Sequence, residues 1–266
     1  MSYKLSPVAV EGEENTYLYP GLLNWTSWNG PFGGALLGSM IEAMEQSTGQ
    51  KLVALTAQFL KTAKHGVPLT FKVETLAAGR AVAQVRASAY QDGALLFTGC
   101  GVLATSGDEF AAGSVGSCPV VRSAEASPAR TYMKPIKDGL NDTVDIRIAE
   151  AVPSHVRLWA RCPGAAGGTL GAALLAALAD HPPYGVQLLK GGEWYGITLD
   201  STLRIASQSA GLDGASWVLL DIGFEAMGEQ FGFATVNLWS VDGRLLAIGT
   251  QTLRIRNGIA PGKTKS

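Results

Sequence analysis

Apolar positions in two stretches of the chain cover most of a helical circumference, and each stretch follows a glycine-rich segment. The first helix is predicted over residues 35–47, and Gly49 is expected to end it. The second is predicted over residues 169–180, where His181-Pro182-Pro183 ends it because proline cannot continue a helix. Helices that are apolar all round are buried rather than amphipathic, so both are expected inside the protein.

Alternating apolar and polar residues around these helices predict antiparallel strands. They are expected over residues 52–60, 68–76, 82–90 and 95–104 in the first half, and over residues 143–149, 155–161, 194–205, 216–226, 231–240 and 245–256 in the second. Asp92-Gly93 and Asp242-Gly243 predict hairpin turns. A helix followed by antiparallel strands therefore occurs twice, which makes the predicted fold class α+β.

The second half of the sequence repeats the first in the same order. Residues 31–46 align with 165–180, Leu60–Ala63 with Leu203–Ala206, and residues 90–105 with 240–255. Read across the copies, Gln46 becomes Asp180, Leu55 becomes Thr198, and Gly101 becomes Gln251. One copy looks like a scaffold and the other like a site.

The repeat divides the chain into an N-terminal unit (1–108), a linker (109–141) and a C-terminal unit (142–266). Ser, Gly, Pro and charged residues are enriched over 106–141, which is typical of a linker. The 266 residues suit two modest domains, and each half is long enough to bury its own core.

Composition narrows the class of protein and its expected partners. Only 16% of residues are charged and the formal net charge is -1, which favours a compact globular protein without a nucleic-acid or membrane partner. No basic segment followed by an apolar run opens the chain, and Leu170–Ala179 is too short to span a bilayer. Cys100, Cys118 and Cys162 form no Cys-x-x-Cys pair, so we expect reduced thiols, no metal site and a cytoplasmic location.

Asp180 is the strongest single candidate for chemistry. It ends an apolar helix that carries no other charge from Leu170 onward. A carboxylate there meets the negative end of the helix dipole, at a cost of about 0.3–1 kcal/mol at an exposed site. Burial and the dipole would both raise its pKa toward the range of a general base. Residue type and position fit equally well a carboxylate that caps the turn at residues 181–183.

Several short motifs carry a family resemblance. Trp28–Gly34 (WNGPFGG) precedes the first helix, Arg157–Arg161 (RLWAR) precedes the second, and Leu178–Asp180, Ile197–Asp200 and Gly249–Gln251 follow in order. Together they resemble the double hot-dog acyl-CoA thioesterases of the thioesterase II (thioesterase-like) superfamily, over nearly the whole chain outside the linker. The resemblance implies a tandem (double) hot-dog, with two apolar helices each wrapped by antiparallel strands of one long curved sheet. It also implies hydrolysis of acyl-CoA without a cofactor, in a homodimer or larger homo-oligomer.

Asp180, Thr198 and Gln251 match the three residues that hold and activate a water in that family. A hydroxyl and an amide can orient a water because each has donor and acceptor capacity. Gln251 shares a strand face with Leu253, so we expect it to point inward. Strict alternation puts Thr198 on the opposite face from Ile197, so it points inward only if a bulge or a strand end intervenes. Taken alone, both residues also fit ordinary strand positions.

Gly33 and Gly34 are candidate substrate-binding residues. Unpaired N–H groups at a helix N-terminus can polarise a thioester carbonyl and stabilise the oxyanion. The glycines fit tight helix–sheet packing equally well. Because sites in hot-dog pairs form between units, the first helix could serve Asp180 of the second.

Other function classes are weaker or absent. An acyl-group-binding protein that lost turnover is one alternative. A hot-dog hydratase is weaker, because His155 and His181 do not recreate its spacing. No Gly-x-Ser-x-Gly elbow, Walker loop or zinc-protease motif is present. The sequence does not identify the acyl chain or the residues that bind the CoA phosphates.

An aromatic pattern predicts an assembly surface. Phe231, Phe233 and Trp239 recur on alternate strand positions, so we expect an exposed outer face that an assembly would cover. The other possibility is that these aromatics line the core.

Overall fold

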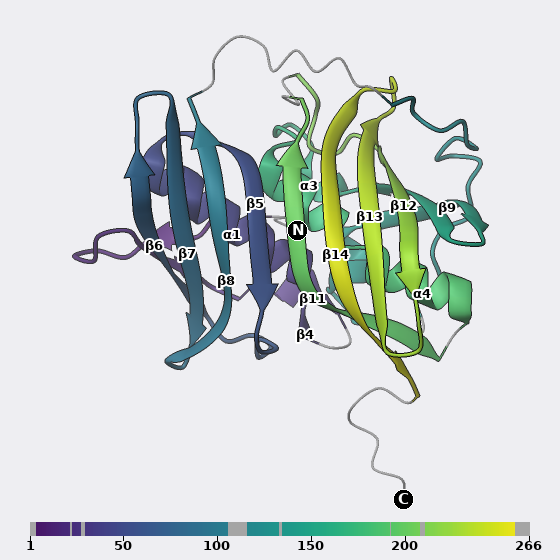
Figure 1. The fold of residues 1–266 in the computed structure, drawn as a ribbon, viewed down its shortest axis with the longest axis horizontal. Helices are drawn as coiled ribbons and strands as arrows, with labels where there is room; N and C mark the ends of the chain where they lie inside the picture. The colour runs from purple at the N-terminus through teal and green to yellow at the C-terminus, as the bar shows by residue number, and fades with distance from the viewer. Residues whose placement is uncertain are drawn as a thin grey trace, which may run out of the picture.

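The computed structural model describes residues 4–21, 23–27, 30–105, 116–132, 135–191, 193–207 and 211–258. One 12-stranded sheet runs through this part of the chain in the order β1-β2-β6-β7-β8-β5-β11-β14-β13-β12-β10-β9, and neighbouring strands are antiparallel. The helices lie against one of its faces (Figure 1). The expected double hot-dog fold is confirmed.

The first half contains β1 (Val8–Ala9), β2 (Thr16–Tyr19), η1 (Leu23–Trp25), β3 (Thr26–Ser27), β4 (Gly30–Pro31), α1 (Gly33–Thr48), β5 (Lys51–Phe59), β6 (Leu69–Ala78), β7 (Val82–Gln91) and β8 (Ala94–Ala104). The second half contains α2 (Leu140–Thr143), β9 (Asp145–Val152), β10 (His155–Arg161), η2 (Pro163–Ala165), α3 (Ala172–Ala179), α4 (Pro182–Lys190), β11 (Trp194–Ile205), β12 (Val218–Met227), β13 (Phe231–Ser240) and β14 (Leu245–Asn257). Each predicted strand is present. The strand predicted to begin at Thr143 begins at Asp145, because Thr143 belongs to α2.

The first helix agrees with its apolar pattern. Helix α1 is buried around most of its circumference, because α3 and the sheet both pack against it. Gly49 ends it in the left-handed conformation at φ 69°, and its N–H donates to the Glu45 carbonyl at 2.9 Å. The predicted stop is therefore confirmed.

The second helix is shorter than predicted, and another helix follows it. Thr169 pairs with Asp213 in an isolated bridge, so α3 begins only at Ala172. Pro182 and Pro183 do end α3, but they also occupy the first positions of α4. A missing N–H is harmless there because the first N–H groups of a helix have no intrahelical partner. Helix α4 was not expected from the sequence.

Small residues bring α1 and α3 into close contact. Gly34 lies against Ala177 and Gly38 lies against Ala173, so the two helices run antiparallel. A Cβ added at Gly38 would lie 2.6 Å from the Ala173 carbonyl oxygen. Glycine is therefore required for the observed separation of the helices.

The two halves join where β5 pairs with β11. Pairing with β8 and with β14 makes Leu55 equivalent to Ser201 and Ala57 equivalent to Leu203. The register of the two strands pairs Leu55 with Leu203 and Ala57 with Ser201. Leu55 therefore faces the copy of Ala57 and Ala57 faces the copy of Leu55, as a two-fold axis requires. The halves are related by a pseudo-two-fold axis between these strands.

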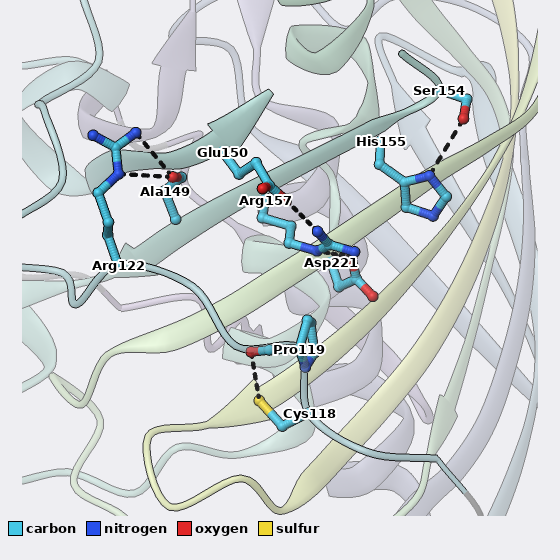
Figure 2. A network of polar contacts seen from close by, with 9 residues as sticks. All are labelled: Cys118, Pro119, Arg122, Ala149, Glu150, Ser154, His155, Arg157 and Asp221. Atoms are coloured by element: carbon cyan, nitrogen blue, oxygen red, sulfur yellow. Dashed lines mark hydrogen bonds and ion pairs between the residues drawn. The ribbon is translucent and has the colours of Figure 1, made fainter. Parts of the chain in front are cut away.

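Residues 116–124, which lie in the segment assigned to the linker, pack on the outer face of the sheet. Trp159 donates its indole N–H to the Arg122 carbonyl at 2.8 Å. Arg122 donates to the Ala149 carbonyl (Figure 2). Ala124 packs with Trp159 and Trp239 in a small apolar cluster. This segment therefore covers part of the convex surface of the second half.

That cover corrects the predicted aromatic surface. Trp239 lies on the outer face but is only 3% exposed, so its expected exposure is wrong. Phe231 and Phe233 are exposed as expected, at 53% and 40%. None of the three belongs to the core on the helix side.

An ion-pair network occupies the same outer face. Arg157 donates through Nε to Asp221 at 2.8 Å and pairs with Glu150 on the adjacent strand (Figure 2). The Arg157–Arg161 motif thus supports the sheet surface with its charged side chains, while Leu158 between them enters the core.

Candidate active site

Asp180 lies at the junction of three elements. It is the C-cap residue of α3 and is only 4% exposed. Its Oδ1 accepts hydrogen bonds from Thr198 Oγ1 at 3.0 Å and from Gln251 Nε2 at 2.8 Å. The structure therefore brings together the three polar residues that distinguish the second copy.

A β-bulge turns Thr198 toward Asp180. Thr198 lies opposite Leu253 of β14 and Asp200 lies opposite Thr252, so Leu199 has no partner in β14. The extra residue reverses the alternation along β11. Thr198 therefore shares the inward face with Leu253, as the sequence allowed only if a bulge was present.

Gln251 reaches the same carboxylate from β14. It lies opposite Ser201 and Ala234 in the sheet and is 1% exposed. Its amide nitrogen is used by Asp180, but its Oε1 has no partner among the described residues. A buried acceptor without a partner is costly, so this oxygen is suited to a donor supplied by a ligand or a water.

The N-terminus of α1 completes the site from the other half. The Gly34 N–H donates to the Asp180 carboxylate. A Cβ at Gly33 would lie 2.8 Å from Asp180 Oδ2, and one at Gly34 would lie 2.7 Å from Asp180 Cβ. Both glycines are therefore required by packing. Among the described residues, the Gly33 N–H has no acceptor. Trp28 and Asn29 of the preceding motif lie outside the described residues.

The surroundings shift the acidity of Asp180. Burial raises the pKa of Asp180, and hydrogen bonds from Gln251, Thr198 and Gly34 offset part of this rise. The net effect is a pKa of about 6, compared with the ordinary value of 3.8. The carboxylate is therefore ionised at neutral pH, with a proton affinity suited to general-base work.

A cavity of about 300 Å³ opens beside Asp180 and is lined by both halves. Phe32 and Phe59 come from the first half, while Thr198 and His181 come from the second. Burial and the charge of Arg130 together lower the pKa of His181 to about 3, and the hydrogen bond with the Leu178 carbonyl offsets part of their effect. Its Nδ1 is 2.8 Å from the Leu178 carbonyl, so this nitrogen carries the proton and the ring is neutral.

The corresponding positions of the first half form no such site. Gln46 is exposed. The register corrects the other equivalence, because Leu52 faces Leu103 as Thr198 faces Leu253, so Leu52 and not Leu55 is the counterpart of Thr198. Leu52 is buried in the core. A Cβ at Gly101 would lie 2.8 Å from the sulfur of Met44, which fills the space that Gln251 occupies in the second half. The asymmetry read from the sequence is therefore present in the packing.

Sequence reasoning missed three residues that line the cavity. Arg130 and Tyr132 lie in the segment assigned to the linker, and Tyr184 lies on the unexpected α4. The sequence signal for these residues is a cation and aromatic side chains close to prolines and glycines that interrupt secondary structure. His181 was noted only as a poor match to a hydratase, yet it also borders the cavity.

Metal-binding clusters and membrane-spanning helices are both missing from the described part of the chain. No group of three or more His, Cys, Asp or Glu side chains there could hold a metal ion. None of the helices in those ranges is both long enough and apolar enough to cross a membrane.

Comparison with known proteins agrees with this architecture. A family model of the acyl-CoA thioesterase N-terminal domain matches residues 23–105, and one of the acyl-CoA thioesterase C-terminal domain matches residues 116–255. The search of curated proteins finds no significant match.

Solved structures share the fold over nearly the whole chain. A candidate thioesterase from Novosphingobium aromaticivorans is 28% identical, with a TM-score of 0.80, over 93% of this chain and 98% of that one. A protein of unknown function with a hot-dog fold from Alicyclobacillus acidocaldarius is 20% identical, with a TM-score of 0.81, over 94% and 96% of the two chains. An acyl-CoA thioesterase II from Mycobacterium marinum is 19% identical, with a TM-score of 0.73, over 96% and 97%. Since the C-terminal family model alone matches more than half of the sequence, the chain belongs to the acyl-CoA thioesterase family.

Proposed function

We propose that the protein hydrolyses acyl-CoA thioesters to the free acid and CoA by direct attack of a water molecule. The observation that supports this is the buried carboxylate of Asp180, which is hydrogen-bonded by Thr198 and Gln251 and borders a cavity. The N-terminus of α1 lies beside it and supplies N–H groups where a carbonyl oxygen would gain charge.

The side chains around the water accept the two hydrogen bonds that its O–H groups can donate. One of its O–H bonds points to Asp180, which takes the proton as the water oxygen attacks the thioester carbon. The other O–H donates to Gln251 Oε1, which has no partner among the described residues. Thr198 already donates its hydroxyl proton to Asp180, so its role is to fix the carboxylate.

The tetrahedral intermediate then breaks down. Its oxyanion accepts a hydrogen bond from the Gly33 N–H, which is not used elsewhere in the described structure. The C–S bond breaks, sulfur leaves with the electron pair, and Asp180 returns the proton to it. The acid and the thiol leave, and Asp180 is again ionised. This sequence needs neither a covalent acyl-enzyme nor a cofactor.

The substitution Asp180→Asn tests the base directly. General-base catalysis contributes about 10²–10⁴-fold, so kcat should fall by about that factor while the fold is retained. Asp200→Asn is the matched control, because Asp200 accepts a bond from the Thr252 N–H outside the site. The readout is thiol release from a panel of short, long and aromatic acyl-CoA thioesters. Near-normal turnover by Asp180→Asn would contradict the assignment.

Isotope labelling tests one covalent route, in which water opens an acyl–Asp180 anhydride at the Asp180 carbonyl. In a single turnover in H₂¹⁸O, direct attack places one ¹⁸O in the product acid. An acyl–Asp180 anhydride opened at the Asp180 carbonyl would instead place the label in the enzyme. Saturable binding of every thioester in the panel without thiol release would favour the alternative of an acyl-binding protein.

We also propose that the chain works as a homodimer or larger homo-oligomer. The exposed pair Phe231 and Phe233 on the outer face of β13 supports this, because adjacent exposed aromatics mark interaction surfaces.

A further inference from the structure

An arginine without a carboxylate partner lies at the cavity that contains Asp180. Arg130 comes from the segment that precedes β9, where its N–H donates to the Ile146 carbonyl at 2.9 Å. Its guanidinium carbon lies 3.7 Å from the centre of the Tyr184 ring and 4.2 Å from that of Tyr132. Both tyrosine rings are therefore within cation–π distance of the guanidinium.

Nothing in the described structure neutralises this charge. Arg130 forms no ion pair there, and its Nε is buried without a hydrogen-bond partner. Burial lowers the pKa of Arg130 below its ordinary value, and Tyr132 and Tyr184 offset only part of that effect. A partly buried charge without a partner is costly, so Arg130 is suited to bind an anion.

The acidic side chains near Arg130 already have other hydrogen-bond or ion-pair partners. Asp145 is paired with Arg147 at 3.3 Å and with Arg161 at 3.1 Å. Asp142 accepts from the Asp138 N–H at 2.8 Å and from the Asn141 amide at 2.9 Å. Within the cavity, the partners of Asp180 are neutral groups, and His181 carries no charge.

We propose that Arg130, beside Tyr132 and Tyr184, is the binding site for an oxyanion that the thioester substrate carries, either a carboxylate or a phosphate. A guanidinium presents N–H donors in a planar fork that matches both groups in a bidentate manner. Its Nε has no hydrogen-bond partner among the described residues, so the fork keeps donor capacity for a ligand. The site shares the cavity with Asp180, so the same molecule can reach both.

The two sources of the anion are a carboxylate at the far end of the acyl chain and the phosphates of CoA. Four thioesters distinguish them: butyryl-CoA, glutaryl-CoA, and the butyryl and glutaryl esters of phosphate-free pantetheine. Calorimetry measures their dissociation constants with Asp180→Asn protein, which leaves the esters intact, with and without the further substitution Arg130→Gln. Because these arms need no turnover, failure of the proposed hydrolysis appears separately as a lack of thiol release by the unsubstituted protein.

Loss of Arg130 should weaken binding about 10- to 100-fold, the usual worth of a charged hydrogen bond, only for esters that carry the recognised group. A loss confined to both CoA esters identifies a phosphate, and a loss confined to both glutaryl esters identifies a carboxylate. Equal weakening of all four esters, butyryl-pantetheine included, or no weakening of any, overturns the proposal.

Two further variants guard against a general effect. Lys72→Gln removes an exposed positive charge that does not line the cavity and should leave all four constants within about twofold. Arg130→Lys keeps the charge but loses the fork, so it should restore part of the affinity. If Arg130→Lys behaved like Arg130→Gln on every ester, or if Lys72→Gln reproduced the loss, a specific oxyanion site at Arg130 would be excluded.

Discussion

Asp180 lies between two helix ends of opposite sign. As the C-cap of α3 it meets the negative end of that helix, while the Gly34 N–H at the positive end of α1 donates to it. The sequence shows only the unfavourable half of this environment. The favourable half comes from a residue nearly 150 positions earlier, and it helps to keep the buried carboxylate ionised at neutral pH.

The rate should therefore depend on pH through Asp180. Its pKa is about 6 in the folded protein, and a general base works only when ionised. We expect kcat/KM to fall tenfold for each pH unit below about 6 and to level off above it. The substrate should be an acyl-pantetheine, because a phosphate monoester also titrates near pH 6. A fall in kcat/KM that began only near pH 4, the ordinary range of the aspartate pKa, would contradict the assignment.

Residue-level prediction succeeded where the signal was local. Asp180 stood out as a lone charge on an apolar helix, and Gln251 followed the strand pattern. The inward direction of Thr198 could not be derived from alternation, because it depends on the one-residue bulge at Leu199. A bulge is set by pairing with another strand, which a single segment does not reveal. Arg130 was missed for a similar reason, since its surroundings come from distant segments.

At the scale of elements, the contact between α1 and α3 depends on two glycines one turn apart. Gly38→Ala places a methyl group 2.6 Å from the Ala173 carbonyl oxygen, and backbone cannot yield as a flexible side chain can. Alanine would otherwise favour the helix by about 0.5–1 kcal/mol. We expect a net loss of about 1–3 kcal/mol in the free energy of unfolding, measured by chemical denaturation.

The control for this substitution is Gly171→Ala. An added Cβ at Gly171 meets nothing within 4 Å, and its φ of -86° is open to alanine. Because alanine is a poorer N-cap than glycine, stability should fall by about 0.5–1 kcal/mol, at or below the low end of the loss expected for Gly38→Ala. If Gly38→Ala were as stable as the unsubstituted protein or more so, the close contact would not limit the helix separation.

The clearest failure of element prediction was helix α4, which the sequence did not indicate. Pro182-Pro183 was correctly interpreted as the end of a helix, but the same prolines are favourable at the start of the next one. Proline marks a boundary without saying which side of it is helical. The strands were easier, because a half-buried sheet enforces alternation over many residues.

At the scale of the whole molecule, the pseudo-two-fold axis explains how one copy could specialise. Both halves supply strands to one sheet and a helix to one core. The first half fills its equivalent positions with Leu52 and with Met44 over Gly101. Its helix α1 instead contributes its N-terminus to the site of the other half. The repeat made this plan predictable, but the path of residues 116–124 over the outer face was not, because a segment without periodicity gives no contact pattern.

The proposed assembly can be tested through the exposed aromatics. Phe231 and Phe233 lie on the same face of β13, and Arg254 lies 4.7 Å from the centre of the Phe231 ring. Light scattering at micromolar concentration should give at least twice the 27.8 kDa of one chain. Replacing both phenylalanines by serine should shift the mass toward a single chain. A clean 27.8 kDa particle for the unsubstituted protein would contradict the proposal.

The strand pairing between β5 and β11 joins two halves of one chain, and this affects how the site behaves when the protein is diluted. Two separate hot-dog chains would have to meet by diffusion before the helix of one could reach the carboxylate of the other. Here both belong to one polypeptide, so their encounter is unimolecular and their effective concentration is fixed by the chain. The contact between Gly34 and Asp180 therefore persists at protein concentrations where a pair of independent halves would have dissociated.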